Sequence, residues 1–104
     1  MRRTLVIALL MSNATAAPAK EPGQVAYELG SVLAAEEFCG FKYDHEKIAA
    51  FIEKNVPAND MGFAPYLQVM TRGKQSKQKG MTGAAKAAHC AQIKRVAKAN
   101  DFIS

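Results

Sequence analysis

Apolar side chains recur every three or four positions along much of the chain, which is the spacing of an α-helix with one buried face. From Gln24 to Cys39 this repeat predicts a first helix, and Gly40 follows it as a stop. The residues expected on its inner face are Val25, Leu29, Val32, Leu33 and Cys39.

A second helix is predicted to begin after Asp44, because an aspartate at this position accepts hydrogen bonds from the free amides of the first turn. Glu46 lies in that turn, where a carboxylate is favoured by the helix dipole. Pro57 ends the helix, since proline has no amide hydrogen to donate. Its inner face is expected to carry Ile48, Phe51, Ile52 and Val56.

The third predicted helix begins after Asn59 or Asp60, either of which is a suitable cap. Pro65 either delays its first turn or kinks it. The apolar spacing continues beyond this proline, so the helix is retained in the prediction. Its inner face is expected to carry Phe63, Tyr66, Leu67 and Met70.

A fourth helix is predicted from Ala84 to about Asp101, with Thr82 as its cap. It is rich in alanine, and small side chains let helix backbones approach closely. We therefore expect it in the middle of the bundle. Its inner face is expected to carry Cys90, Ile93, Val96 and Ala97.

No window alternates apolar and polar residues over more than a few positions, so no strand is predicted. The fold class is therefore all-α, a small bundle of about four helices. With 49% hydrophobic and 22% charged residues, the composition is that of a globular protein. A length of 104 residues leaves room for one domain.

The first nineteen residues show the three-part layout of a secretory signal peptide. Arg2 and Arg3 precede an apolar run over residues 4–11, and small residues follow to position 19. The run is shorter than the roughly 20 apolar residues that span a bilayer, so no transmembrane span is predicted. With cleavage expected after Ala16 or Ala19, we divide the chain into a signal peptide, 1–19, and one helical domain, 20–104. The mature protein is expected in the periplasm or outside the cell.

The chain has two cysteines, Cys39 and Cys90. Export would carry them to an oxidising compartment, where pairing is expected. A reactive thiol pair would require a Cys-x-x-Cys motif or one activated thiol, and the sequence has neither. The prediction is a structural disulfide that ties the end of the first helix to the middle of the fourth and stabilises the domain by about 4 kcal/mol.

Charge is divided unevenly along the predicted domain. Residues 20–61 hold four lysines and eight carboxylates, whereas residues 62–104 hold eight basic residues and Asp101 alone. The simpler interpretation is that acidic and basic helices pair with each other. The alternative is an anionic partner, which in a bacterial envelope means lipid phosphates, wall carboxylates or an acidic protein surface. Nucleic acid is not an expected partner of an exported protein.

The segment from Arg72 to Gly80 is basic and free of apolar residues, so it is expected to be an exposed helix end or loop. It either follows a row of anionic groups or serves as a soluble connection. The residues proposed to contact an anionic partner are Arg72, Lys74, Lys77, Lys79, Lys94 and Arg95.

Three aromatic residues, Phe38, Phe41 and Tyr43, surround Cys39. They are a candidate patch for binding a partner. Packing over the disulfide is the simpler interpretation, because aromatic rings bury large apolar areas.

Catalytic and metal-binding patterns have little support. The histidines are His45 and His89, and neither belongs to a motif with a nucleophile. His89 and Cys90 point about 100° apart around a helix, so they do not easily share a metal ion. We therefore expect no cofactor, no metal site and no enzymatic activity.

Several short runs carry a resemblance to a known family: Leu33–Gly40, Tyr43–Asp44, Phe51–Ile52, Leu67–Gly73, Ala88–Cys90 and Phe102–Ile103. Through these runs the chain resembles small secreted two-cysteine proteins of alphaproteobacteria, and the resemblance extends over nearly all of the predicted domain. The function of this family is largely uncharacterised, and some members are labelled "signal recognition particle". The resemblance implies a helical fold and adds no chemistry. Through Cys39 and Cys90 alone, the chain is more loosely similar to the periplasmic acid-stress chaperone HdeA.

These observations predict a non-catalytic binding or regulatory protein of the bacterial envelope, which modulates a cell-wall enzyme or supports envelope integrity. One alternative is a periplasmic chaperone of the HdeA kind, which opens in acid. Protonation of all carboxylates and both histidines would give residues 20–104 a strong positive charge, and such self-repulsion expands a domain. A small enzyme or metal carrier using His45 and His89 is the other alternative.

Overall fold

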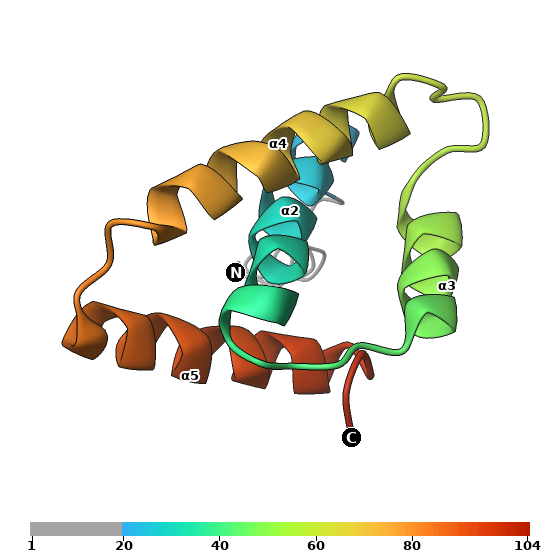
Figure 1. Ribbon diagram of the computed structural model, residues 1–104. Coiled ribbons are helices and arrows are strands. Elements are labelled where there is room, and N and C mark those ends of the chain that lie inside the picture. Colours follow the sequence, from blue (N-terminus) through green and yellow to red (C-terminus); the bar gives the residue numbers. More distant parts are fainter. Residues whose placement is uncertain (1–19) are drawn as a thin grey trace, which may run out of the picture.

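The computed structural model describes residues 20–104, and this part of the chain folds into four helices with no strand (Figure 1). The helices are α2 (Pro22–Phe38), α3 (His45–Asn55), α4 (Phe63–Gln78) and α5 (Gly83–Ala99). The predicted all-α fold is confirmed. The predicted signal peptide, residues 1–19, lies outside the described residues.

Helix α2 is the centre of the fold, because both α4 and α5 pack against it (Figure 1). Its buried residues follow the predicted stripe, Val25, Leu29 and Val32, and add small side chains between them. Gly30 allows the close approach of α4, since a Cβ atom there would lie only 2.9 Å from the Cβ of Met70. The core of the domain is Val25, Ala26, Leu29, Val32, Ala35, Tyr43, Phe63, Ile93, Ala97 and Phe102.

The prediction that the alanine-rich fourth helix occupies the middle of the bundle is wrong. Residues 83–88 of α5 are exposed on every side. In the second half of α5, Ile93 and Ala97 reach the core, as predicted. The many alanines of α5 therefore reflect the high helix propensity of this residue rather than close packing.

Two of the predicted helix starts are confirmed. Asp44 accepts hydrogen bonds from the backbone amides of Glu46 and Lys47, and Thr82 accepts one from that of Ala85. The predicted cap of the third helix is wrong, because α4 begins after Gly62 without a side-chain cap.

Helices α2 and α5 end in the same way. In each, a residue with positive φ, Gly40 (75°) or Asp101 (62°), follows the cap residue. The next amide then donates back to the helix, from Phe41 to the carbonyl of Glu36 and from Phe102 to that of Ala97. This is the Schellman motif, and it turns the chain sharply at both places.

The turn after α5 places Phe102 in the core, where it is the largest fully buried side chain among the described residues. Its ring lies 5.6 Å from that of Phe51 and 6.2 Å from that of Tyr43. Its carbonyl accepts a hydrogen bond from the amide of Asp44, so the segment after α5 is tied to the start of α3. The sequence pattern did not place Phe102 in the core.

Helix α3 is the least integrated helix and stands beside the others (Figure 1). None of its residues is buried, although its predicted apolar stripe packs against the core. In α4, Phe63 is buried as predicted, whereas Tyr66 is 45% exposed and does not belong to the core. Within residues 20–104, no helix combines the length and apolar character needed to cross a membrane.

Candidate functional site

The predicted disulfide is confirmed and fixes the position of α5. Cys39 and Cys90 are bonded, with their Cα atoms 5.6 Å apart. Cys39 is the cap residue of α2, and Cys90 lies in the middle of α5. Because the packing of α5 on α2 is otherwise light, this bond determines where the exposed first half of α5 lies.

The basic residues of the second half of the domain are not paired with carboxylates. Among residues 20–104 the ion pairs are Lys20 with Glu28 and His45 with Glu36, the second at 3.5 Å. Neither involves a residue from 62–104. The expected pairing of acidic with basic helices is therefore not found in this part of the chain, and the positive charge of α4 and α5 faces solvent.

The six candidate contacts for an anionic partner lie on two helices rather than in one cluster. Arg72 and Lys77 are exposed on α4, and Lys79 follows directly as its exposed cap residue. The other two exposed candidates, Lys94 and Arg95, lie on α5. Both helices pack on α2. We use the term cationic surface for these six residues, which are spread over the two helices: Arg72, Lys74, Lys77, Lys79, Lys94 and Arg95.

Lys74 differs from the other members of the cationic surface because it contacts α2. Its ammonium lies 3.6 Å from the centre of the Tyr27 ring, which is a cation–π geometry. Tyr27 itself is 52% exposed, so this pair remains at the surface.

The basic segment over residues 72–80 is mostly helical. Helix α4 continues to Gln78, whose side chain is buried and lies 3.4 Å from the ring of His89 (Nε2 to Nε2). Two alternatives were predicted for this segment, a helix end and a loop. The helix end is correct for its last residues, whereas the loop is wrong for residues 72–78, which belong to α4. Arginine, lysine and glutamine are good helix formers, and one glycine costs the helix only about 1 kcal/mol.

The structure separates the three aromatic candidates. Tyr43 is buried, and Phe41 packs beside it with their ring centres 6.1 Å apart. Phe38 instead lies near His89, at 6.4 Å, with the ammonium of Lys86 4.5 Å above its ring. Tyr43 therefore serves the core, and only Phe38 and Phe41 have exposed ring surface.

Tyr43 joins the end of α2 to the linker that follows it. Its hydroxyl donates to the carbonyl oxygen of Val32 at 2.7 Å, and its amide donates to the carboxylate of Glu36 at 2.8 Å. Burial raises the pKa of Tyr43 to about 12, and the charge of Glu36 acts in the same direction.

The two histidines lie in different surroundings. His45 is exposed in the first turn of α3, beside Glu36, and His89 is half-buried beside Gln78. No group of three histidine, cysteine, aspartate or glutamate side chains within residues 20–104 is placed to hold a metal ion.

A hollow of about 590 Å³ lies between α2, α3 and α5, and the sequence pattern did not predict it. Its polar lining residues are exposed or half-buried, and we call them its rim. Its six apolar lining residues are buried or half-buried, and we call them its walls. All the wall residues except Phe102 had been assigned to the inner faces of helices. The rim consists of Lys20, Glu28, Lys54, Asn55 and Asn100, and the walls are Val25, Leu29, Val32, Phe51, Val96 and Phe102.

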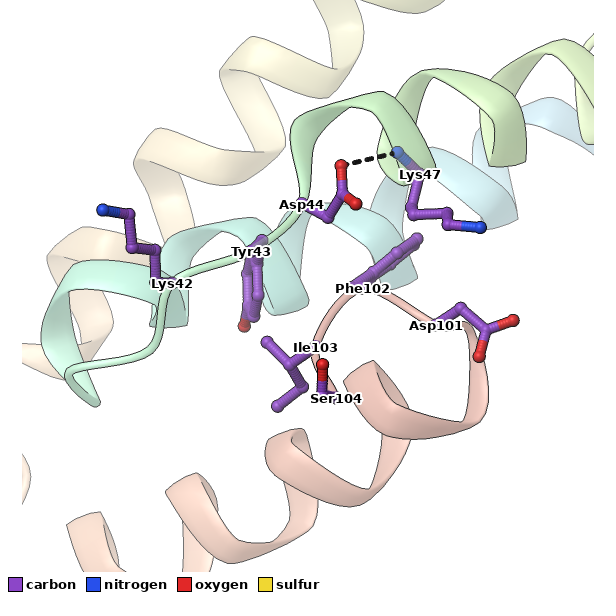
Figure 2. A pocket seen from close by; sticks show the side chains of 8 residues that line it. All are labelled: Lys42, Tyr43, Asp44, Lys47, Asp101, Phe102, Ile103 and Ser104. Atoms are coloured by element: carbon purple, nitrogen blue, oxygen red, sulfur yellow. Dashed lines mark hydrogen bonds between the residues drawn. The ribbon is translucent and has the colours of Figure 1, made fainter.

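A second, more polar hollow of about 470 Å³ is also lined by Phe102 (Figure 2). Lys42 and Lys47 line it together with Asp44 and Asp101, so it carries charges of both signs. This mixture favours neither an anion nor a cation.

Comparison of the chain with family models, with curated proteins and with solved structures gives no match. The cationic surface and the apolar hollow are therefore interpreted from their geometry and chemistry.

Proposed function

We propose that this protein is a non-catalytic binding module of the bacterial envelope, which holds an anionic partner on the cationic surface of α4 and α5. One observation carries the proposal: the basic residues of the second half of the domain have no carboxylate partner within ion-pair distance among residues 20–104. Unpaired surface cations attract and orient anionic partners, and this attraction weakens as salt is added.

The arrangement of this charge fits an extended partner better than a small ion. The cationic surface spans two helices, both packed on α2, and the disulfide fixes one of them. A row of lipid phosphates, of wall carboxylates or of acidic side chains presents charge over a comparable area. Through such contacts the protein would regulate a cell-wall enzyme or support envelope integrity.

The proposal includes export to the periplasm or the cell exterior. The disulfide is compatible with such a location, because stable disulfides are rare in the cytosol. Mass spectrometry of the protein from its native host tests this point. Export requires a chain cleaved near Ala16 or Ala19 with its cysteines oxidised, and an intact amino terminus with free thiols would contradict it.

Binding is tested by co-sedimentation of the oxidised protein with purified peptidoglycan and, separately, with vesicles containing anionic phospholipid. Affinity capture from a periplasmic extract, with the captured protein identified, covers the third type of partner. We expect one of these partners to bind, and we expect the binding to weaken strongly between 50 and 300 mM salt.

The matched variants are two triple substitutions that remove the same charge from different places. The triple variant R72Q/K77Q/K79Q removes three cations from the cationic surface, whereas K42Q/K47Q/K54Q removes three from the first half of the domain. We expect at least tenfold weaker binding for the first and little change for the second. Equal losses in both would show that net charge alone attracts the partner, and the proposed surface would be rejected.

A second candidate function, an acid-activated chaperone, is favoured by the loose attachment of α3. Glu36 accepts a hydrogen bond from the amide of Tyr43 in the linker before α3 and lies 3.5 Å from His45, the first residue of α3, but α3 itself buries no residue. At low pH the positive charge of the domain rises, and the resulting repulsion would act most easily on this loosely attached helix. A dye that binds apolar surface and a client-aggregation assay at pH 2–3 test this candidate, which fails if neither responds.

A further inference from the structure

We infer that the hollow between α2, α3 and α5 is a binding site for a single-chain anionic amphiphile, a molecule with one unbranched hydrocarbon tail and a carboxylate head. The site is separate from the cationic surface, since no residue of that surface lines it. The inference therefore goes beyond the proposed function and does not depend on it.

The dimensions and walls of the hollow suit a small apolar ligand. Its volume of about 590 Å³ lies within the range of roughly 300 to 1,000 Å³ that is usual for ligand sites. Three helices supply its apolar walls, and its polar lining residues are more exposed to solvent than its apolar ones. This division between an apolar interior and a polar mouth matches a molecule with a tail and a head.

The charges at the rim favour a negative head. Lys20 is paired with Glu28, so these two charges compensate each other. Lys54, in the last turn of α3, has no carboxylate within ion-pair distance among residues 20–104. Asn55 and Asn100 each donate their side-chain amide to a carbonyl of their own helix, and so add no charge. The net charge of the mouth is therefore positive and is carried by Lys54.

The wall formed by α3 can yield to a tail. No residue of α3 is buried, and its Phe51 meets Phe102 edge to face at 5.6 Å. A helix held by partly buried side chains can move outward without breaking its own hydrogen bonds. The hollow can therefore widen along α3 while α2, which carries the centre of the core, stays in place.

The test is isothermal titration calorimetry of the oxidised protein with octanoate, decanoate and dodecanoate, each below its micelle-forming concentration. We expect one saturable site, with an affinity that rises roughly tenfold for each two methylene groups added. Dodecyltrimethylammonium has the same tail and a cationic head, and we expect it to bind at least fivefold more weakly than dodecanoate.

Two lysine variants on the same helix separate the site from general charge attraction. K54Q should weaken dodecanoate binding severalfold, whereas K47Q, which removes an equal charge outside the hollow, should leave it unchanged. The variant V96W places a large side chain in the hollow at a half-buried position and should weaken binding more than tenfold. Circular dichroism establishes whether V96W is folded. If it is not, the comparison of K54Q with K47Q tests the inference.

The inference would be overturned by absence of a saturable site, by equal affinity for the cationic amphiphile, or by equal effects of K54Q and K47Q. The triple variant R72Q/K77Q/K79Q should retain full affinity for dodecanoate. Loss of binding in that variant would also overturn the inference, because it would place the amphiphile on the cationic surface instead.

Discussion

At the scale of single residues, two positions with positive φ decide the path of the chain. Gly40 and Asp101 have the same role after α2 and α5, but only glycine adopts this conformation without steric cost. Asp101 also places a negative charge at the carboxyl end of α5, where the helix dipole disfavours it. The domain therefore has a strained residue beside its most buried aromatic side chain.

Replacement of Asp101 by glycine is expected to stabilise the protein by about 0.5–1 kcal/mol, because it relieves the backbone strain and the unfavourable charge. The opposite change, Gly40→Ala, should destabilise it by about 1 kcal/mol. Urea unfolding followed by circular dichroism measures both. A loss of stability in D101G would instead show that the Asp101 carboxylate makes a favourable contact in the folded protein.

The buried hydroxyl of Tyr43 predicts a stability loss at alkaline pH. An unfolded tyrosine titrates near pH 10, whereas burial and Glu36 raise the pKa of Tyr43 to about 12 in the folded protein. The contribution to the free energy of unfolding is fully present below pH 10 and is lost as the pH rises towards 12.

The variant Tyr43→Phe isolates this contribution. It should be less stable than the wild type at pH 7, by about 1 kcal/mol, because the hydrogen bond to Val32 is absent. The difference between the two proteins should then shrink between pH 10 and 12. A constant difference over this range, measured by urea unfolding, would contradict the assignment.

At the scale of helices, the contact between α2 and α4 depends on one small residue. A Cβ at Gly30 would lie 2.9 Å from the Cβ of Met70 and 3.2 Å from the backbone nitrogen of Thr71. Backbone cannot move aside as the end of a flexible side chain can, so the two helices would have to separate.

We expect Gly30→Ala to destabilise the protein by about 1–3 kcal/mol, the usual cost of overpacking. Gly73→Ala is the matched control, since a Cβ at Gly73 would meet nothing within 4 Å. Alanine is the better helix former, so G73A should stabilise α4 by up to about 1 kcal/mol. Thermal unfolding of both variants measures the contrast, and similar effects in the two would refute the importance of the close approach.

Most helix positions could be predicted from residues within the same helix, and the exceptions have physical causes. Asp44 and Thr82 are caps that act within their own helix, so the sequence revealed them. The start of α4 was missed because Gly62 supplies no side-chain cap and Pro65 fits in the first turn, where its missing amide is not needed. The buried side chain of Gln78 lies beside His89 of another helix, and the spacing of residues along α4 cannot reveal a contact between helices.

At the scale of the whole molecule, the candidate site was predicted only in part. The unequal charge of the two halves is a property of composition, and the six residues of the cationic surface were proposed from it. Whether carboxylates neutralise the positive charge of the second half depends on how the helices pack together. The spacing of residues along one helix does not specify that packing. The apolar hollow could not be predicted from the sequence. It results from the loose packing of α3 around residues that individually suit a core.

Reduction of the disulfide is expected to lower the free energy of unfolding by about 4 kcal/mol, because it frees a loop of 51 residues in the unfolded chain. Residues 83–88, which have no buried side chain, should lose amide protection first. Hydrogen exchange of the oxidised and reduced protein tests this order. The double variant C39S/C90S should behave like the reduced protein, and retention of full stability in either would show that the bond is dispensable.

The position of Phe102 also bears on how the protein is made. The hydrophobic core draws together residues as distant as Val25 and Phe102, so a nascent chain cannot complete it until Phe102 has left the ribosome. Until Phe102 emerges, the polypeptide is therefore open and its core is incomplete. A translocation channel accepts unfolded chains, so late completion of the core would be consistent with the proposed export.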